Sequence, residues 1–425
     1  MENLEILYHR IEDSNDSFLI TGQAGAGKSS LVRIIKAYSK RNTVLLASTG
    51  VAAQLINGTT LHSFFGFQPG ITEDMIRKMK ISKKKELILS GIDTFVIDEV
   101  SMIRADWLDC VEAYLHQFGK NPRKPFGGYQ LVLSGDLFQL PPVVQPSEET
   151  IFHSFYETPF FFSAHSYPSL CYQVLYLHDN LRQTDKETIT LLHQIREGEI
   201  TKELIRLVNE HVSPMEYREE DFCIVLTATH EKENRVNEER LSLLSSPTRT
   251  FSAFVEGNYP VKQYPTQKQL SLAIGAQVMF VTNDTSGRYV NGTLGIVEDI
   301  LDNAENPIIS IRLEGNVMVR LEREVFQYRR IQWDNVSQRI SSEVIGRFIQ
   351  FPVRLAWAIT IHKSQGKTFQ NIHIDLGRGA FAEGQVYVAL SRCRSFEDVT
   401  LQVPLQEPDL LVNPKVQEFY RQLIV

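Results

Sequence analysis

Cysteine is scarce in this chain of 425 residues: the four cysteines lie far apart, and no two of them form a CxxC pair. Structural zinc sites and iron–sulfur clusters are built from closely spaced cysteines, so this spacing argues against both. We therefore expect Cys110, Cys171, Cys223 and Cys393 to be reduced thiols, as is usual in the cytosol.

Long hydrophobic runs are also missing, because no apolar stretch approaches the ~18 residues that span a bilayer. The acidic start, with Glu2 and Glu5, resembles neither a signal peptide nor a transit peptide. The expectation is a cytoplasmic protein, nucleoid-associated if the source is bacterial, with no membrane partner. The length allows roughly two to four domains.

Positively charged residues are outnumbered: the chain has 44 Lys and Arg and 51 Asp and Glu, which gives a net charge of −7. This balance argues mildly against a nucleic-acid partner. Screening, however, limits charge effects to about 8–10 Å, so local basic clusters matter more than the total. One cluster, either a nucleic-acid contact or an ordinary solvated helix face, consists of Arg77, Lys78, Lys80, Lys83, Lys84 and Lys85.

A phosphate-binding motif stands out near the start, where GQAGAGKS (residues 22–29) follows an apolar run and precedes apolar residues at helical spacing. The pattern predicts a strand, a glycine loop and a helix, whose backbone N–H groups hold a triphosphate. Lys28 is placed to reach the β and γ phosphates and Ser29 to ligate Mg²⁺. The expected nucleotide contacts are Gly22, Gly25, Ala26, Gly27, Lys28, Ser29 and Ser30.

Two further strand ends carry polar residues suited to hydrolysis. The segment TFVIDE (94–99) ends in Asp98, expected to hold Mg²⁺, and Glu99, expected to polarise the attacking water. The segment QLVLSGDLFQLPPV (130–143) ends near Gln139, a candidate γ-phosphate sensor. We find neither an Asn-Lys-x-Asp guanine motif nor a phosphoacceptor pocket, which argues against a GTPase and a kinase.

The second half repeats the strand and helix pattern in CIVLTA (223–228) and NIHIDLG (371–377), but it has no second glycine loop. The GKT at Gly366–Thr368 lacks the first glycine, because Ile361 occupies that place. We therefore expect an α/β protein with two RecA-like domains that share one triphosphate. Arg182 and Arg392 are candidate arginine fingers, the alternative being ordinary surface or ion-pair residues.

Residues 250–345 read instead as strands, with Asn291-Gly292 as a hairpin turn signal. This texture predicts a small β-domain inserted into the second core. The sequence leaves open whether that domain contacts DNA or is an insertion without any DNA contact.

Together these motifs resemble superfamily-one DNA helicases in order and spacing, over nearly the whole chain. PFGGYQ (125–130) is similar to the signature of the PIF (petite integration frequency) helicases rather than to RecD-like relatives. The other motifs that carry the resemblance are GQAGAGKS, ASTGVAAQLINGTTLHSFFG, FVIDEVSM, SGDLFQLPPV, NLRQ, AITIHKSQGKT and VYVALSRCR.

The resemblance implies an ATP- and Mg²⁺-dependent helicase that moves 5′ to 3′ along single-stranded DNA and unwinds duplex forks, with G-quadruplexes as a further substrate. It assigns hydrolysis to Lys28 and Glu99, γ-phosphate sensing to Gln139, and the finger roles to Arg182 and Arg392. It also implies a role in DNA replication, DNA repair and telomere maintenance. We expect a monomer without DNA, and protein partners are not predicted. The implied DNA contacts are Thr49, Gly50, His62, Phe64, Thr360, His362, Lys363 and Ser364.

The resemblance also divides the chain. It implies a first RecA-like domain at 1–63 and 89–178, a wedge insertion at 64–88, a second RecA-like domain at 179–249 and 346–425, and an SH3-like β insertion at 250–345. Phe64, Phe65 and Phe67 are expected either to stack on a base at the fork or to form a hydrophobic core. For His62 and His362, the alternative to a DNA contact is an ordinary hydrogen-bonded position in the core.

One departure from the family is that residues 1–21 contain no glutamine to read adenine, so ATP over other triphosphates is an expectation only. Three other functions stay open: a RecD-like helicase or weakly unwinding translocase, a P-loop switch acting on a protein partner, and a purely structural DNA-binding module.

Overall fold

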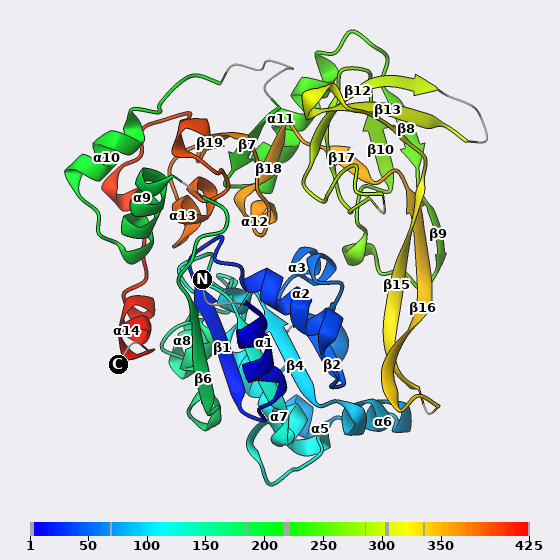
Figure 1. The fold of residues 1–425 in the computed structure, drawn as a ribbon, viewed down its shortest axis with the longest axis vertical. Coiled ribbons are helices and arrows are strands. Elements are labelled where there is room, and N and C mark those ends of the chain that lie inside the picture. The colour runs from blue at the N-terminus through cyan, green and yellow to red at the C-terminus, as the bar shows by residue number, and fades with distance from the viewer. Residues whose placement is uncertain are drawn as a thin grey trace.

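Two parallel-sheet cores lie one above the other in the computed structural model, and a β-domain extends beside both of them (Figure 1). The structure describes residues 4–68, 70–183, 185–215, 222–284, 286–301, 306–334 and 336–423.

The first core is a six-stranded parallel sheet with the order β3-β2-β4-β5-β1-β6. Three central strands are buried along their whole length, which explains why they read as largely apolar runs. The strands are β1 (Ser17–Gly22), β2 (Thr43–Ala47), β3 (Thr59–Thr60), β4 (Thr94–Asp98), β5 (Gln130–Ser134) and β6 (Tyr172–Leu177).

Helices cover both faces of this sheet. Successive residues of β1 point to opposite faces, so Phe18 and Ile20 pack in the cluster that contains α1 and α2, whereas Leu19 packs in the cluster that contains α7. The helices of this half are α1 (Leu4–Glu12), α2 (Lys28–Tyr38), α3 (Gly50–Leu55), α4 (Leu61–Phe65), α5 (Glu73–Lys78), α6 (Lys83–Gly91), α7 (Ala105–Phe118) and α8 (Glu149–Phe155).

The second core is a four-stranded parallel sheet with the order β18-β7-β19-β20. Its strands are β7 (Cys223–Thr227), β18 (Ala358–Thr360), β19 (Asn371–Asp375) and β20 (Val399–Leu401). Its helices are α9 (Lys186–Glu197), α10 (Lys202–Asn209), α11 (His230–Ser242), α12 (Ile361–Ser364), α13 (Gln385–Leu390) and α14 (Pro414–Leu423). The last of these returns to the first core, where Phe419 stacks on Phe162 with ring centroids 4.6 Å apart.

The β-domain combines a five-stranded antiparallel sheet (order β14-β13-β12-β11-β17), a β8–β10 pair and a three-stranded sheet. In the last, the long strands β15 and β16 form a hairpin, here called the ribbon, which runs along the first core (Figure 1). The strands are β8 (Arg249–Ser252), β9 (Phe254–Gly257), β10 (Gln269–Leu272), β11 (Gln277–Phe280), β12 (Leu294–Leu301), β13 (Ile308–Leu313), β14 (Met318–Leu321), β15 (Glu324–Asp334), β16 (Arg339–Gln350) and β17 (Val353–Leu355).

The structure refines two expectations in this domain. Asn291-Gly292 does not form a two-residue hairpin turn, because β11 and β12 are joined by the longer segment 281–293 and the pair lies just before β12. Strands also continue past residue 345, since β17 pairs with β11.

The α/β class with two RecA-like cores is confirmed, and the domain limits stay predictions. Among the described residues, no helix combines the length and apolar character needed to cross a bilayer.

Candidate nucleotide and DNA site

The glycine loop joins β1 directly to α2, as the sequence predicts. Gly25 and Gly27 have φ values of 86° and 92°, the left-handed region that favours glycine. Lys28 Nζ donates to the carbonyl oxygens of Gly22 and Gln23 at 2.7 and 2.9 Å. Burial lowers the pKa of this lysine. A phosphate at the loop would offer the ammonium a charged partner in place of the two carbonyls.

Two carboxylates face the loop from the end of β4. Ser134 Oγ donates to Asp98 Oδ1 at 2.8 Å, and burial raises the pKa of Asp98. Burial, followed by the charge of Asp98, raises the pKa of Glu99 to about 7, while Lys28 acts in the opposite direction. Asp98 is buried and Glu99 is half-buried. Two adjacent carboxylates near a serine hydroxyl fit a hard divalent cation, with Asp98 and Ser29 as its candidate ligands.

The two candidate fingers lie together in the second half of this site. Leu181 N donates to Gly25 O at 2.9 Å, which places Arg182 against the glycine loop. Arg182 Nη1 donates to Ser391 O at 2.8 Å. Arg392 is wholly buried, and burial, followed by the charge of Arg182, lowers its pKa to about 9. Glu99 acts on the pKa of both arginines, so both guanidinium groups lie within its electrostatic reach.

Arg392 is nevertheless held by its own core. Its guanidinium donates to the carbonyl oxygens of Val388, Ser364 and Lys367 at 2.8, 3.2 and 3.3 Å. The guanidinium of Arg392 can therefore reach a nucleotide only by giving up these hydrogen bonds to backbone carbonyls.

A second contact between the cores involves the candidate sensor. Gln365 Nε2 donates to Gln139 Oε1 at 3.4 Å, and both side chains are buried. Gln139 follows β5 of the first core, whereas Gln365 follows α12 of the second, so the contact links the nucleotide edge of one core to the other.

Sequence reasoning missed a buried network behind the glycine loop. Tyr387 Oη accepts a hydrogen bond from Ala24 N at 2.8 Å and donates to Asp136 Oδ2 at 3.1 Å. Asp136 in turn forms a fully buried ion pair with Arg196, 3.1 Å long. Asp136 stood in the recognised SGD segment, but no local signal linked it to a tyrosine 251 residues away.

The expected DNA contacts begin at two short helices that face each other across the cores (Figure 1). Thr49 caps α3 by accepting from Ala52 N at 3.2 Å, and Thr360 caps α12 by accepting from Lys363 N at 3.4 Å. A Cβ placed on Gly366 would lie 3.0 Å from Leu55 of α3, so the two segments are neighbours.

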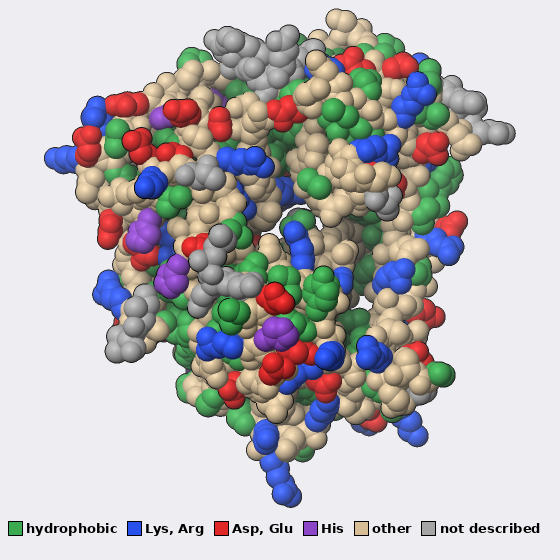
Figure 2. Space-filling model, viewed as in Figure 1, with side chains coloured by type: hydrophobic (Ala, Val, Ile, Leu, Met, Phe, Trp, Pro, Cys, Tyr) green, Lys and Arg blue, Asp and Glu red, His purple; other side chains and the backbone are tan. Residues whose placement is uncertain are grey.

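An inter-core cavity of about 420 Å³ lies beside these helices. Thr49, Gly50 and Lys363 all line it, which brings three of the expected DNA contacts to one space. Lys363 is not a free cation there, because Glu233 accepts from its ammonium at 2.8 Å. Figure 2 shows a hollow between the two halves of the molecule with Lys or Arg side chains at its edge.

The other expected DNA contacts are more enclosed. The ring of His62 meets Trp107 edge-on at a centroid distance of 4.0 Å, and burial lowers the pKa of His62 and of His362. Ser364 is fully buried and donates to Ile361 O at 2.7 Å. These contacts favour the core alternative for the histidines and give Ser364 a role within its own helix.

The three phenylalanines of the wedge region also belong to the core. Phe64, Phe65 and Phe67 are all buried, and Phe65 meets Phe95 and Tyr114 at centroid distances of 6.0 and 5.1 Å. Of the two interpretations that the sequence left open, the structure therefore supports hydrophobic core. Phe64 is 6% exposed, which favours the core, and its contact with DNA stays a prediction.

Comparison with known proteins agrees with this geometry. Residues 4–206 match the family model described as PIF1-like helicase. The chain is 34% identical to the ATP-dependent DNA helicase PIF1 of Xenopus laevis over 96% of its own length, but it spans only 62% of that protein. It is 32% identical to the ATP-dependent DNA helicase Pif1 of Bdellovibrio bacteriovorus, over 96% of this chain and 89% of that one.

Solved structures give the same result. Pif1 from Bacteroides sp in complex with ADP-AlF4 matches with a TM-score of 0.88 and 31% identity, over 99% of this chain and 96% of that one. Bacteroides Pif1 bound to single-stranded DNA matches with the same coverage and 32% identity, but with a TM-score of 0.71. The chain belongs to the PIF1-like helicase family.

Proposed function

We propose that this protein is an ATP-dependent DNA helicase that moves 5′ to 3′ along a single strand and unwinds the duplex ahead of it. The observation that carries the proposal is the meeting of a glycine loop, a carboxylate pair and two arginines from the other core around one space. Such an arrangement hydrolyses a triphosphate only when the two cores close on it.

The side chains divide the chemistry among them. Lys28 would hold the β and γ phosphates, and Glu99 would accept a proton from the water that attacks the γ phosphorus. Arg182 and Arg392 would offset the negative charge that develops on the γ-phosphoryl oxygens. Mg²⁺, held by Ser29 and Asp98, would supply further neutralisation of the phosphates.

Coupling to DNA would run through the contacts between the cores. Gln139 would sense the γ-phosphate and pass its presence to Gln365, which follows the α12 segment that borders the inter-core cavity. Thr49 and Gly50 on one side and Lys363 on the other would then hold the sugar–phosphate backbone in alternation. Duplex forks and G-quadruplexes are the proposed structured substrates.

Strand displacement on two matched duplexes, one with a 5′ and one with a 3′ single-stranded tail, tests the proposal in the presence of ATP and Mg²⁺. We expect unwinding of the 5′-tailed duplex alone, and none by Lys28→Ala. Unwinding of the 3′-tailed duplex alone would overturn the polarity. Hydrolysis stimulated by DNA without any unwinding would leave a translocase, and no stimulation would leave a regulatory switch.

A further inference from the structure

The last described helix, α14, lies against the first core, although in sequence it follows the last strand of the second core (Figure 1). Its neighbouring residues Phe419 and Tyr420 are both buried. The ring of Tyr420 stacks on Phe138 with centroids 4.8 Å apart. Phe138 directly precedes Gln139, the candidate γ-phosphate sensor, so α14 packs against residues 136–139, here called the sensor segment.

The hydroxyl of Tyr420 joins two parts of the nucleotide site. It shares a hydrogen bond of 2.6 Å with Thr21 Oγ1, and it accepts from Leu137 N at 3.2 Å. Thr21 lies near the end of β1, just before the glycine loop, and Leu137 belongs to the sensor segment. One buried hydroxyl therefore ties the strand that leads into the glycine loop to the segment that carries the sensor.

The backbone of the sensor segment depends on this hydroxyl. Phe138 N donates to Asp136 Oδ1 at 3.3 Å, and Gln139 N donates to Asp136 O at 3.0 Å, so both find a partner within the segment. Leu137 N takes its partner from α14 instead. Because a buried N–H group without a partner is costly, loss of the hydroxyl of Tyr420 should release the segment from its present position.

The second core holds the same segment from another side. A Cβ on Gly384, just before α13, would collide with the carbonyl oxygens of Phe138 and Gln139, so the two backbones are in close contact. The start of α14 is anchored beside this glycine, because Asn413 Nδ2 donates to Glu383 Oε2 at 2.8 Å. A displacement of the second core would therefore bear on the sensor segment through both helices.

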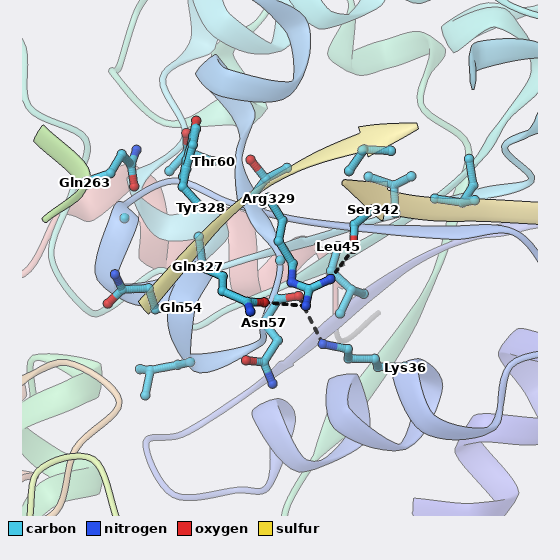
Figure 3. Close-up of a pocket in the computed structure, with 18 of the residues that line it drawn as sticks. Lys36, Leu45, Gln54, Asn57, Thr60, Gln263, Gln327, Tyr328, Arg329 and Ser342 are labelled. Carbon is cyan, nitrogen blue, oxygen red and sulfur yellow. Dashed lines mark hydrogen bonds between the residues drawn. The ribbon is translucent and has the colours of Figure 1, made fainter. Parts of the chain in front are cut away.

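The contacts of Tyr420 lie apart from two cavities beside the first core. In the cavity of about 770 Å³ between the ribbon and this core, Lys36 and Arg329 come from opposite walls and point toward the same space (Figure 3). Neither this cavity nor the inter-core cavity is lined by Thr21, Leu137 or Tyr420. Removal of the hydroxyl should therefore change the nucleotide steps and leave the affinity for single-stranded DNA, measured without nucleotide, unchanged.

We propose that Tyr420 is a positioning residue for ATP hydrolysis: its hydroxyl fixes the sensor segment against β1, so that Gln139 meets the γ-phosphate at a set distance from the glycine loop. The inference rests on the proposed function and deepens it, because it concerns the same nucleotide site. Burial raises the pKa of Tyr420 above its ordinary value, so the hydroxyl keeps its proton. Tyr420 acts through Thr21 and Leu137 rather than on the nucleotide itself.

Tyr420→Phe tests this role, because it removes the hydroxyl and keeps the ring that stacks on Phe138. We expect the kcat of DNA-stimulated hydrolysis to fall about tenfold or more, since the N–H of Leu137 loses its partner. The ratio of the Kd for ADP to the Kd for a non-hydrolysable ATP analogue should also fall, because only the analogue offers a γ-phosphate to Gln139. Steady-state kinetics and nucleotide titrations measure both quantities.

The matched control is Tyr129→Phe. The hydroxyl of Tyr129 is also buried and also makes two hydrogen bonds: it donates to Leu89 O at 2.8 Å and accepts from Lys120 N at 3.2 Å. Tyr129 directly precedes β5, at the amino end of the strand, whereas the nucleotide site lies at the carboxyl ends. This variant should keep the wild-type kcat and the wild-type ratio of Kd values.

Thr21 provides a second pair of variants, and melting temperatures check the folding of all of them. Thr21→Val removes the hydroxyl that faces Tyr420 and should lower the ratio, whereas Thr21→Ser keeps a hydroxyl and should preserve it. Thr21→Val should add little in the Tyr420→Phe background, because both changes break the same hydrogen bond. If Tyr420→Phe does not fold, the Thr21 pair decides, and Thr21→Val that matches Thr21→Ser would overturn the role of Tyr420.

A lower kcat and a lower ratio in Tyr420→Phe, but not in Tyr129→Phe, support the role. Equal values in these two variants, in a protein whose hydrolysis is stimulated by DNA, overturn it and leave the helicase proposal intact. A lower kcat with an unchanged ratio also overturns it, because γ-phosphate sensing would then be unaffected. Wild-type protein without stimulation by DNA would instead fail the helicase proposal, and this inference with it.

Discussion

At the scale of single residues, burial sets the behaviour of several charged groups, and Lys85 is a clear case. Its ammonium donates to Phe64 O and lies 3.4 Å from the centroid of the Phe64 ring. Burial lowers the pKa of Lys85 to about 7. The unfolded chain, with a pKa of about 10.4, therefore binds a proton between these two values that the folded chain lacks.

The consequence is a stability that rises with pH. The penalty for folding is fully present below about pH 7 and is lost as the pH rises toward about 10.4. Lys85→Met removes the titrating group, so its melting temperature relative to wild type should be more favourable at about pH 6 than at about pH 9. Thermal unfolding at both pH values measures this, and an equal difference at both would contradict it.

Arg392 allows a second prediction at this scale. Arg392→Ala should lower the rate of DNA-stimulated hydrolysis by ~10³-fold, because an arginine finger stabilises charge that develops only in the transition state. Binding of a non-hydrolysable ATP analogue should change far less. A variant that hydrolyses ATP at the normal stimulated rate would show that the buried contacts of Arg392 with Val388, Ser364 and Lys367 are its whole role.

At the scale of elements, α13 connects the glycine loop to Arg392, the proposed arginine finger. Tyr387, near the start of the helix, bonds Ala24 and Asp136, and Arg392 follows just beyond the end of the helix. A shift of the glycine loop would therefore move Arg392 through the short helix α13.

Tyr387→Phe removes only the hydroxyl of this connection. The buried N–H of Ala24 and the carboxylate of Asp136 each lose a partner, at a cost of about 1–3 kcal/mol. We expect DNA-stimulated kcat to fall about tenfold or more. Tyr114→Phe is the matched control, since it also removes a buried tyrosine hydroxyl but lies on α7, away from the nucleotide site. Steady-state kinetics that are equal for the two variants would contradict the connection.

Local motifs and long-range contacts differ in how far the sequence predicts them. The glycine loop and Asp98 were predictable because a strand end, a turn and a helix start are specified by neighbouring residues. The bond between Tyr387 and Asp136 was not, because it depends on how two cores pack. The rings of Phe64 and Phe65 were ambiguous for a related reason: an aromatic pair reads the same in a core and on a DNA surface.

At the scale of the whole molecule, the ribbon closes onto the first core. Lys84 pairs with Glu343 at 3.6 Å, and the hydroxyl groups of Ser63 and Tyr328 lie 2.9 Å apart. A Cβ placed on Gly91 of α6 would lie 1.9 Å from Cζ3 of Trp333, so this ring sits directly on the helix. The overall arrangement is closer to that of the Bacteroides protein with ADP-AlF4 than to that of its complex with single-stranded DNA.

This contact leads to a prediction about DNA binding. Gly91→Ala adds a methyl group where the Trp333 ring lies, so the ribbon must move away from α6. We expect the closed ribbon to compete with DNA, so a variant that destabilises the closed arrangement should raise the fraction of protein able to bind DNA. The apparent Kd for oligothymidylate should therefore fall, and a tenfold fall would correspond to about 1.4 kcal/mol. Trp333→Ala should act in the same direction, and Gly91→Ala should add nothing in that background, because the clash is gone. Anisotropy measures all four Kd values. Additive effects would show that Gly91 acts through α6 itself, and an unchanged Kd in both single variants would show that the closed ribbon does not compete with the strand.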